Sequence, residues 1–278
     1  MFQPVIPLTG NGGWKFLEAT YDRQLESHSK SPQVSRDRDY LVEKFSAPVT
    51  VEGLLDDPRL LRVALTAFDL GGEEWKRGFI DKVLEESIDP ESTFLARLNN
   101  SKYTAFAKAM NPVGGQISLS PAVLSNMAAQ FEANSFEAAV GEVDDNMRLS
   151  LNYKSGIGSI AGTGSSENAI LFRILGDVPT RTLLEGATNL PTDIRKLPLE
   201  RQAVILKERL QSTLGIKHMS ELTSAENVDK VIQRFHAMES ISQNAASYSP
   251  ASSALTLLGY SNGGLGSLGS QNLFLSLL

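Results

Sequence analysis

Residues 57–70, DPRLLRVALTAFDL, carry the full set of signals of a short amphipathic helix and decide the fold class. Asp57 can cap the free amide groups of a helix, and Pro58 suits the first helical position, which needs no amide donor. Apolar residues then recur at the spacing of one helical face, at Leu60, Leu61, Ala64, Leu65 and Phe68. Gly71 and Gly72 end the pattern. The stretch therefore predicts a helix with one buried face.

The same combination of caps and helical periodicity recurs along most of the chain. Further helices are predicted at about residues 14–29, 35–45, 51–55, 73–86, 92–98, 101–110, 120–133, 134–153, 167–175, 180–188, 198–214 and 225–241. One stretch, MRLSLNY at 147–153, is ambiguous because it also shows the alternation of a half-buried strand. The sequence thus predicts an all-α protein built as a multi-helix bundle.

Two segments resemble each other closely enough to suggest an internal duplication. LLDDPRLLRVALTAFDL at 54–70 aligns without gaps to ILGDVPTRTLLEGATNL at 174–190. The alignment pairs Asp57 with Asp177, Val63 with Leu183, Ala67 with Ala187 and Leu70 with Leu190. One interpretation is a bundle of two related helical halves that pack on each other. The other is that any two amphipathic helices look alike.

Composition divides the chain into five parts. We expect a flexible N-terminal segment at 1–13, a first helical half at 14–154, a Gly/Ser-rich connection at 155–166, a second helical half at 167–243 and a Ser/Gly/Leu-rich tail at 244–278. The connection, SGIGSIAGTGSS, has the composition of a hinge, and the tail has that of a flexible linker. Flexible segments are therefore expected at both ends of the helical body.

The overall composition is that of a folded, acidic protein. The 278 residues are 41% hydrophobic and 21% charged, which is far from the composition of disordered chains. The formal net charge of -6 attracts phosphate backbones little, so nucleic acid is not expected as a partner. No run of about 18 apolar residues occurs, so no transmembrane segment is expected. The start, MFQPVIPLTGNGG, lacks the charged and apolar regions of a secretory signal.

The chain contains no cysteine. This excludes disulfide bonds, thiolate metal sites and cysteine nucleophiles. Two explanations stay open. The absence is chance in a bacterial cytosolic protein, or it protects a chain that crosses the inner membrane unfolded, where a free thiol risks wrong crosslinks.

No arrangement of side chains predicts catalysis, a cofactor or a metal ion. The histidines are His28, His218 and His236, and the last two have a glutamate three residues later, Glu221 and Glu239. Two such pairs could meet at a metal ion, but no HExxH motif occurs and this spacing is common on solvated helices. The glycine-rich stretch lacks the lysine of a phosphate-binding loop and the parallel sheet of a dinucleotide fold. We expect a protein that is not an enzyme.

Apolar residues at the two ends of the chain are the candidate partner-binding residues. They are Phe2, Val5 and Ile6 near the start, and Leu273, Phe274, Leu275, Leu277 and Leu278 at the end. Such side chains are stabilised by packing, either on a partner or on the protein's own surface. Trp14 and Trp75 fall instead on helical apolar stripes and are expected to be buried anchors.

Several segments resemble a bacterial family known as domain-of-unknown-function family 1217. They are GWKFLEATYDRQLESHSKSPQVSRDRDY at 13–40, DPRLLRVALTAFDL at 57–70, and FIDKVLEE with ARLNNSKYTAFAKAM at 79–110. The resemblance continues through MRLSLNYK at 147–154 and reaches about residue 241. The family tends to show Arg-Leu-Ala-Leu-Tyr where this chain has RLSLN at 148–152, so packing there is expected to differ.

The resemblance implies a role in the flagellum, because proteins like this are commonly encoded among flagellar genes of alphaproteobacteria. It carries over no catalytic residue. The implied function is a non-enzymatic structural or interaction protein of the bacterial flagellum or basal body, as an export substrate or a basal-body component. Its expected partners are other flagellar or export proteins. The alternative is a cytoplasmic export chaperone or regulator that binds a helix of its partner. The oligomeric state stays open.

Overall fold

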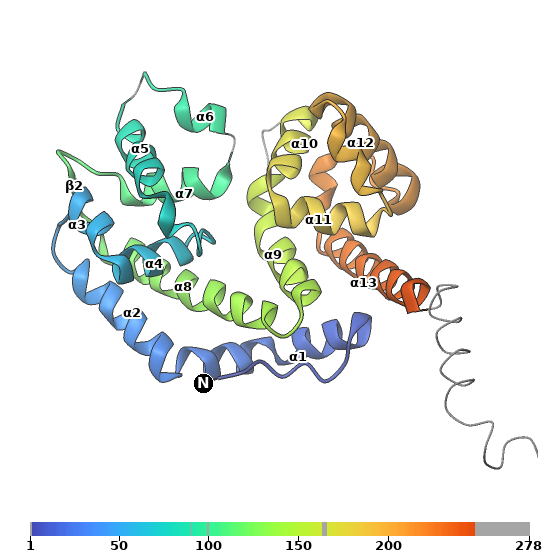
Figure 1. Ribbon diagram of the computed structural model, residues 1–278, viewed down its shortest axis with the longest axis horizontal. Coiled ribbons are helices and arrows are strands. Elements are labelled where there is room, and N and C mark those ends of the chain that lie inside the picture. The colour runs from blue at the N-terminus through green and yellow to red at the C-terminus, as the bar shows by residue number, and fades with distance from the viewer. Residues whose placement is uncertain (1, 90, 99, 163–165, 248–278) are drawn as a thin grey trace, which may run out of the picture.

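The computed structural model consists almost entirely of helices (Figure 1). It describes residues 2–89, 91–98, 100–162 and 166–247, with side chains described as far as residue 242. Within these ranges two short strands, β1 at Val49–Thr50 and β2 at Gln116–Ile117, pair antiparallel. The predicted all-α class is confirmed.

The helices follow one another with short connections, as the caps in the sequence predict. The α-helices are α1 (Gly10–Ser29), α2 (Pro32–Lys44), α3 (Val51–Asp56), α4 (Pro58–Thr66), α5 (Arg77–Ser87), α6 (Phe94–Leu98), α7 (Ser101–Met110), α8 (Pro121–Gly141), α9 (Asp145–Ile160), α10 (Glu167–Gly176), α11 (Val178–Ala187), α12 (Leu199–Leu214) and α13 (Ala225–Ser247). Short 3-10 turns are η1 (Glu74–Lys76), η2 (Thr192–Lys196) and η3 (Met219–Thr223).

The two helices that the sequence aligns, α4 and α11, are built alike. Asp57 and Asp177 cap them, and each carboxylate accepts a hydrogen bond from the amide three residues later, at 2.9 and 3.1 Å. Each helix is followed by a residue with a left-handed backbone, Asp69 with φ 55° and Asn189 with φ 53°. Aspartate and asparagine tolerate this conformation better than most residues. The likeness is confined to these caps and turns, and a duplication of whole halves stays a prediction.

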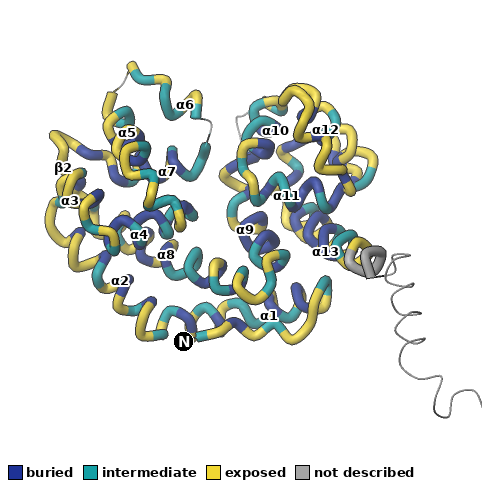
Figure 2. Tube along the Cα trace, in the orientation of Figure 1, coloured by how far each residue is buried: buried dark blue, intermediate teal, exposed yellow. Residues whose placement is uncertain are grey.

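Buried apolar residues form two clusters, and α8 contributes to both (Figure 2). The first lobe comprises α2 to α7 and the start of α8, with Leu41, Leu61 and Phe106 in its core. The second lobe comprises α1, the end of α8 and α9 to α13, with Phe136 and Phe235 in its core. The two cores therefore part inside α8, and not at the connection that the composition suggested.

The Gly/Ser-rich stretch is helical over most of its described length. Helix α9 continues to Ile160, and the side chains of Ile157 and Ile160 are buried in the second lobe. Gly156 and Gly158 lie where an added Cβ would meet nothing within 4 Å, so these glycines face open space. The ambiguous stretch at 147–153 is also part of α9. Isoleucines spaced three residues apart gave this segment a buried helical face that its composition obscured.

The start of the chain differs most from expectation. Helix α1 begins at Gly10, and residues 2–8, here called the N-terminal strap, fold back along it (Figure 1). Gly10 has φ +61°, and an added Cβ at Gly13 would overlap the carbonyl oxygen of Leu8. Two glycines thus permit the chain reversal and the close approach. The segment expected to be flexible has a defined place on the helical body.

The two tryptophans have opposite environments. Trp14 is 2% exposed and lies in the core of the second lobe, as predicted. Trp75 is 78% exposed, so the prediction that it is a core anchor is wrong. It lies in the three-residue turn η1, which is too short to have a buried face, and Lys76 Nζ lies 5.2 Å from its ring centroid.

Candidate functional site

A groove of about 930 Å³ runs between the N-terminal strap, the end of α1 and helices α2, α4 and α8. Its lining includes Phe2 from the strap, His28 from α1, Val34 from α2, Arg62 from α4 and Phe131 from α8. These segments are far apart in the sequence, so no single motif marks the groove. Its volume is in the range that binding pockets of proteins occupy.

The side chain of Gln24 holds the N-terminal strap by hydrogen bonds to its backbone, in the way that a neighbouring β-strand would. The backbone N–H of Val5 donates to Gln24 Oε1 at 2.8 Å, and Gln24 Nε2 donates to the carbonyl oxygen of Val5 at 3.1 Å. Gln24 is buried on α1, and its Nε2 also donates to Thr20 Oγ1 at 2.8 Å. The amide of Gln24 therefore satisfies both backbone groups of one strap residue.

Phe2 fills one end of the groove. Its ring meets the His28 ring edge-on with centroids 5.4 Å apart, and the Phe136 ring lies 6.2 Å away. His28 Nε2 lies 2.9 Å from Ser135 Oγ, whereas its buried Nδ1 has no hydrogen-bond partner among the described residues. Burial lowers the pKa of His28, so its ring is mostly neutral at pH 7. The strap thus covers a neutral aromatic surface.

The most buried charged side chain of the groove, Asp37, is held by two arginines. Asp37 is 5% exposed and accepts hydrogen bonds from Arg59 and Arg62, both at 2.8 Å. Burial alone would raise the pKa of Asp37, but the hydrogen bonds and positive charges of the two arginines lower it below its usual value. The Asp37 carboxylate therefore has a structural role in these two ion pairs and is poorly placed to act as an acid or a base.

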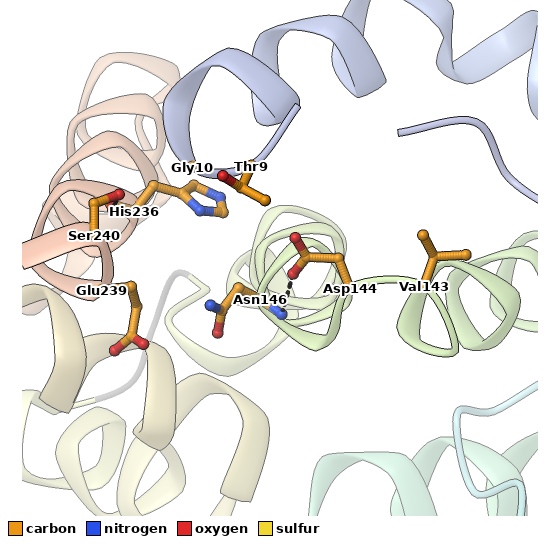
Figure 3. Close-up of a pocket in the computed structure, with 8 residues that line it drawn as sticks. All are labelled: Thr9, Gly10, Val143, Asp144, Asn146, His236, Glu239 and Ser240. Atoms are coloured by element: carbon orange, nitrogen blue, oxygen red, sulfur yellow. Dashed lines mark hydrogen bonds between the residues drawn. The ribbon is translucent and has the colours of Figure 1, made fainter. Parts of the chain in front are cut away.

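A second pocket, of about 240 Å³, lies where the start of α1, the start of α9 and α13 meet (Figure 3). His236 enters it from α13 and is 1% exposed. His236 Nε2 lies 3.0 Å from Ser150 Oγ, and its ring stacks on Trp14 at 6.1 Å between centroids. Burial lowers the pKa of His236 to about 4, so the imidazole is neutral at pH 7.

A polar joint connects the two lobes. Lys102 Nζ lies 2.6 Å from Asp69 after α4 and 3.2 Å from Asp177, which caps α11. Asn152 Nδ2 donates to Asp69 at 2.6 Å. Burial would lower the pKa of Lys102, but the two carboxylates raise it. Burial, followed by the charge of Asp69, raises the pKa of Glu137 to about 7.

The structure places the candidate partner-binding residues in different settings. Phe2 and Ile6 are partly buried against the core of the second lobe, whereas Val5 is 58% exposed. The candidates at the end of the chain, Leu273, Phe274, Leu275, Leu277 and Leu278, lie outside the described residues. The strap is therefore packed on the protein itself in the isolated chain.

The histidines do not come together. His218 Nδ1 lies 3.1 Å from Glu167 Oε1 on α10, and His236 contacts Ser150, while His28 lies in the groove. Among the described residues no group of three His, Asp or Glu side chains could hold a metal ion. In the same ranges no helix is long and apolar enough to cross a bilayer.

The sequence did not predict that Gln24 binds the strap, nor did it predict the groove that Phe2 enters. A signal was present in TGNGG at 9–13, because so many glycines at a helix start indicate a chain reversal. The pairing of Gln24 with the strap had no such signal, since it depends on packing between segments 19 residues apart.

Comparison with known proteins shows the fold and the family. The crystal structure of protein AGR_C_984 from Agrobacterium tumefaciens is similar to this chain with a TM-score of 0.66 and 21% sequence identity. The similarity covers 85% of this chain and 97% of that one. No protein of curated function matches the chain. A family model described as "Protein of unknown function (DUF1217)" matches residues 49–231, about two thirds of the sequence, and the chain therefore belongs to that family.

Proposed function

We propose that this chain is a non-enzymatic interaction protein of the bacterial flagellum, either an export substrate or a component of the basal body. The observation that carries the interaction role is the groove whose one end is filled by the chain's own N-terminal strap. The flagellar assignment rests on the family resemblance, which implies genes that lie among flagellar genes.

The lining of the groove favours binding over chemistry. Its buried acid, Asp37, is held by two arginines, and its histidine, His28, is a neutral ring against Phe2. An acid or base catalyst needs a free titratable group within reach of a substrate. A lining that combines apolar side chains with a paired charge is typical of a surface that receives a polypeptide segment.

The hold on the strap is modest enough for a partner to compete with it. The two hydrogen bonds between Gln24 and Val5 contribute on the order of 1 kcal/mol each, and the partly buried side chains of Phe2 and Ile6 contribute about 1–2 kcal/mol each. A partner segment with comparable contacts would displace the strap and expose Phe2 and Ile6, next to Val5, which is already exposed. The apolar residues at the start of the chain would then become available to the assembly.

Fractionation tests the proposal. A tagged copy would be quantified in cytosol, medium and purified hook and basal bodies, in a wild-type strain and in one that lacks flagellar export. We expect the protein in the basal body or the medium of the wild type, and its loss from these fractions without export. Retention in the cytosol of both strains would contradict the proposal.

A cytoplasmic export chaperone or regulator is the second candidate. The observation that favours it is the size of the groove, about 930 Å³, which suits the apolar face of a partner helix. This function predicts a stable complex with one flagellar protein in the cytosol and no copy outside the cell. The fractionation above separates it from the first candidate.

A further inference from the structure

The pocket beside His236 has the lining of a binding site for a donor-rich ligand. The residues that line it are His236 and Glu239 on α13, Asp144 and Asn146 at the start of α9, and Thr9 at the start of α1 (Figure 3). The pocket adjoins the groove at Val143, which lines both, and its volume of about 240 Å³ equals that of roughly eight water molecules. It is large enough for a small organic group.

The hydrogen bonds of Ser150 fix the tautomer of His236. Ser150 Oγ lies 2.8 Å from the carbonyl oxygen of Asn146, which can only accept, so the hydroxyl hydrogen is donated there. The 3.0 Å contact between Ser150 Oγ and His236 Nε2 must then be donated by Nε2–H. His236 Nδ1 therefore carries a lone pair. Among the described residues no hydrogen bond reaches this atom, which keeps a trace of solvent contact in a residue that is 1% exposed.

The remaining walls of the pocket also present acceptors. Asp144 uses Oδ1 to cap α9 and leaves its other oxygen uncommitted among the described contacts. Glu239 brings a second carboxylate, and no lysine or arginine lines the pocket. The amino ends of α1 and α9 each add about half a positive charge, which together is less than the charge of two carboxylates. The pocket therefore favours a cation that donates hydrogen bonds.

A metal ion does not fit this lining. The described residues contain no group of three side chains close enough to share one ion. An alkylammonium group spans a wider space, because its hydrogen bonds are about 2.8 Å long and its carbon chain can lie against Val143.

We propose that this pocket binds a primary ammonium group, which donates to His236 Nδ1 and is neutralised by Asp144 and Glu239. The group belongs either to a free small amine or to a lysine side chain of a partner protein, and the chemistry at the pocket is the same for both. The proposal does not depend on the function of the groove.

Nitrogen NMR of the histidine rings in the full-length protein tests the proposal. The probes are butylammonium chloride and the blocked lysine Nα-acetyl-lysine methylamide, with tetramethylammonium chloride as a cation of equal charge that has no N–H donor. We expect the two primary amines to shift the His236 Nδ1 resonance saturably, and tetramethylammonium to leave it unchanged. Tighter binding of butylammonium would indicate a free amine as the natural ligand, and tighter binding of the blocked lysine would indicate a partner's lysine.

Variants on α13 make the test specific. Glu239→Gln should weaken binding of the primary amines about tenfold, because it removes one charge from the pocket. Glu226→Gln, on the exposed first turn of the same helix, should leave binding unchanged. The absence of a saturable shift, an equal shift with tetramethylammonium, or unchanged affinity in Glu239→Gln would overturn the proposal.

Discussion

At the scale of single residues, two neighbouring glycines have opposite roles. An added Cβ at Gly13 would overlap the carbonyl oxygen of Leu8, whereas one at Gly12 would lie 3.4 Å from Leu8 Cδ1, an ordinary contact. We expect Gly13→Ala to lower the free energy of unfolding by about 1–3 kcal/mol and to loosen the strap. The readouts are chemical denaturation and hydrogen exchange of the Val5 amide.

Gly12→Ala is the matched control for that variant. Alanine is favoured over glycine inside a helix by about 1 kcal/mol, so Gly12→Ala should be neutral or stabilising and should leave exchange of the Val5 amide unchanged. Equal effects of the two substitutions would show that the strap does not depend on the close approach at Gly13.

Glu137 gives the stability of the protein a defined dependence on pH. Its pKa in the folded state is about 7 and the ordinary value is 4.5, so between these values the folded state binds more protons than the unfolded state. This contribution is fully present below pH 4.5 and is lost as the pH rises through 7. We expect Glu137→Gln to raise the free energy of unfolding at pH 8, relative to the natural chain, by about 1–3 kcal/mol.

Denaturation of both proteins at pH 5 and pH 8 checks this expectation. Both proteins share every other ionisable group, so the contributions of those groups cancel in the difference. Glu142→Gln, which changes an exposed glutamate on the turn after α8, should leave the pH dependence as it is. A difference between Glu137→Gln and the natural chain that is equal at the two pH values would contradict the assignment.

At the scale of elements, the turns after α4 and α11 have the same backbone conformation, but their side chains make different contacts. Asn189 is exposed at φ 53°, whereas Asp69, at φ 55°, also binds Lys102 and Asn152. Glycine relieves the strain of this conformation, so Asn189→Gly should stabilise the protein by about 0.5–1 kcal/mol. Asp69→Gly should destabilise it by about 1–3 kcal/mol, since Lys102 and Asn152 lose a partner.

Thermal unfolding of the two glycine variants measures the difference. Stabilisation by both substitutions would mean that the contacts of Asp69 across the joint contribute nothing to folding. Destabilisation by both would mean that the turn needs a side chain, and the strain argument would fail.

Elements with local signals could be predicted, and elements held by distant contacts could not. Asp57, Ser120 and Pro121 mark helix starts by chemistry that acts within one turn, and the structure has helices there. The prediction that Trp75 is buried was wrong because periodicity does not reveal whether a helix is long enough to bury a face. The prediction of a hinge at residues 155–160 was wrong because it rested on the glycine composition, whereas Ile157 and Ile160 pack in the core of the second lobe.

At the scale of the whole molecule, the boundary between the two hydrophobic cores lies inside α8, whereas the composition had predicted a boundary at residues 155–166. Helix α8 gives Met127 and Phe131 to the first lobe and Phe136 and Val140 to the second. A fragment of residues 14–154 would therefore expose apolar side chains that α10 to α13 cover in the complete chain. The buried residues of the first core, from Val34 to Phe131, all lie inside the fragment, so we expect this part to unfold cooperatively. In the same fragment α1 and the end of α8 should lose their protection from hydrogen exchange, because their packing partners are removed.

A fragment of residues 1–247 is the matched control, because it keeps both cores and removes only the tail. It should unfold in a cooperative transition like that of the complete chain. Protection of α1 in the 14–154 fragment equal to that in the complete chain would contradict the division inside α8 and would favour an independent first half.

The candidate site, the groove, is also a property of the whole folded molecule. The sequence pointed to Phe2, Val5 and Ile6 as residues that pack on something, but it could not say on what. The groove is assembled from the strap and helices α1, α2, α4 and α8, so its shape exists only in the folded chain. Contacts between such distant segments leave no pattern in a single sequence.

The most direct test of the groove as the partner surface is site-specific photo-crosslinking in flagellated cells. Because the chain has no cysteine, a single cysteine can carry the photoreactive label, at Gln33 on the groove or at Gln211 on the exposed face of α12 as the control. We expect a discrete adduct with a flagellar or export protein, identified by mass spectrometry, from Gln33→Cys and none from Gln211→Cys. No adduct from Gln33→Cys, or equal adducts from both positions, would contradict the account.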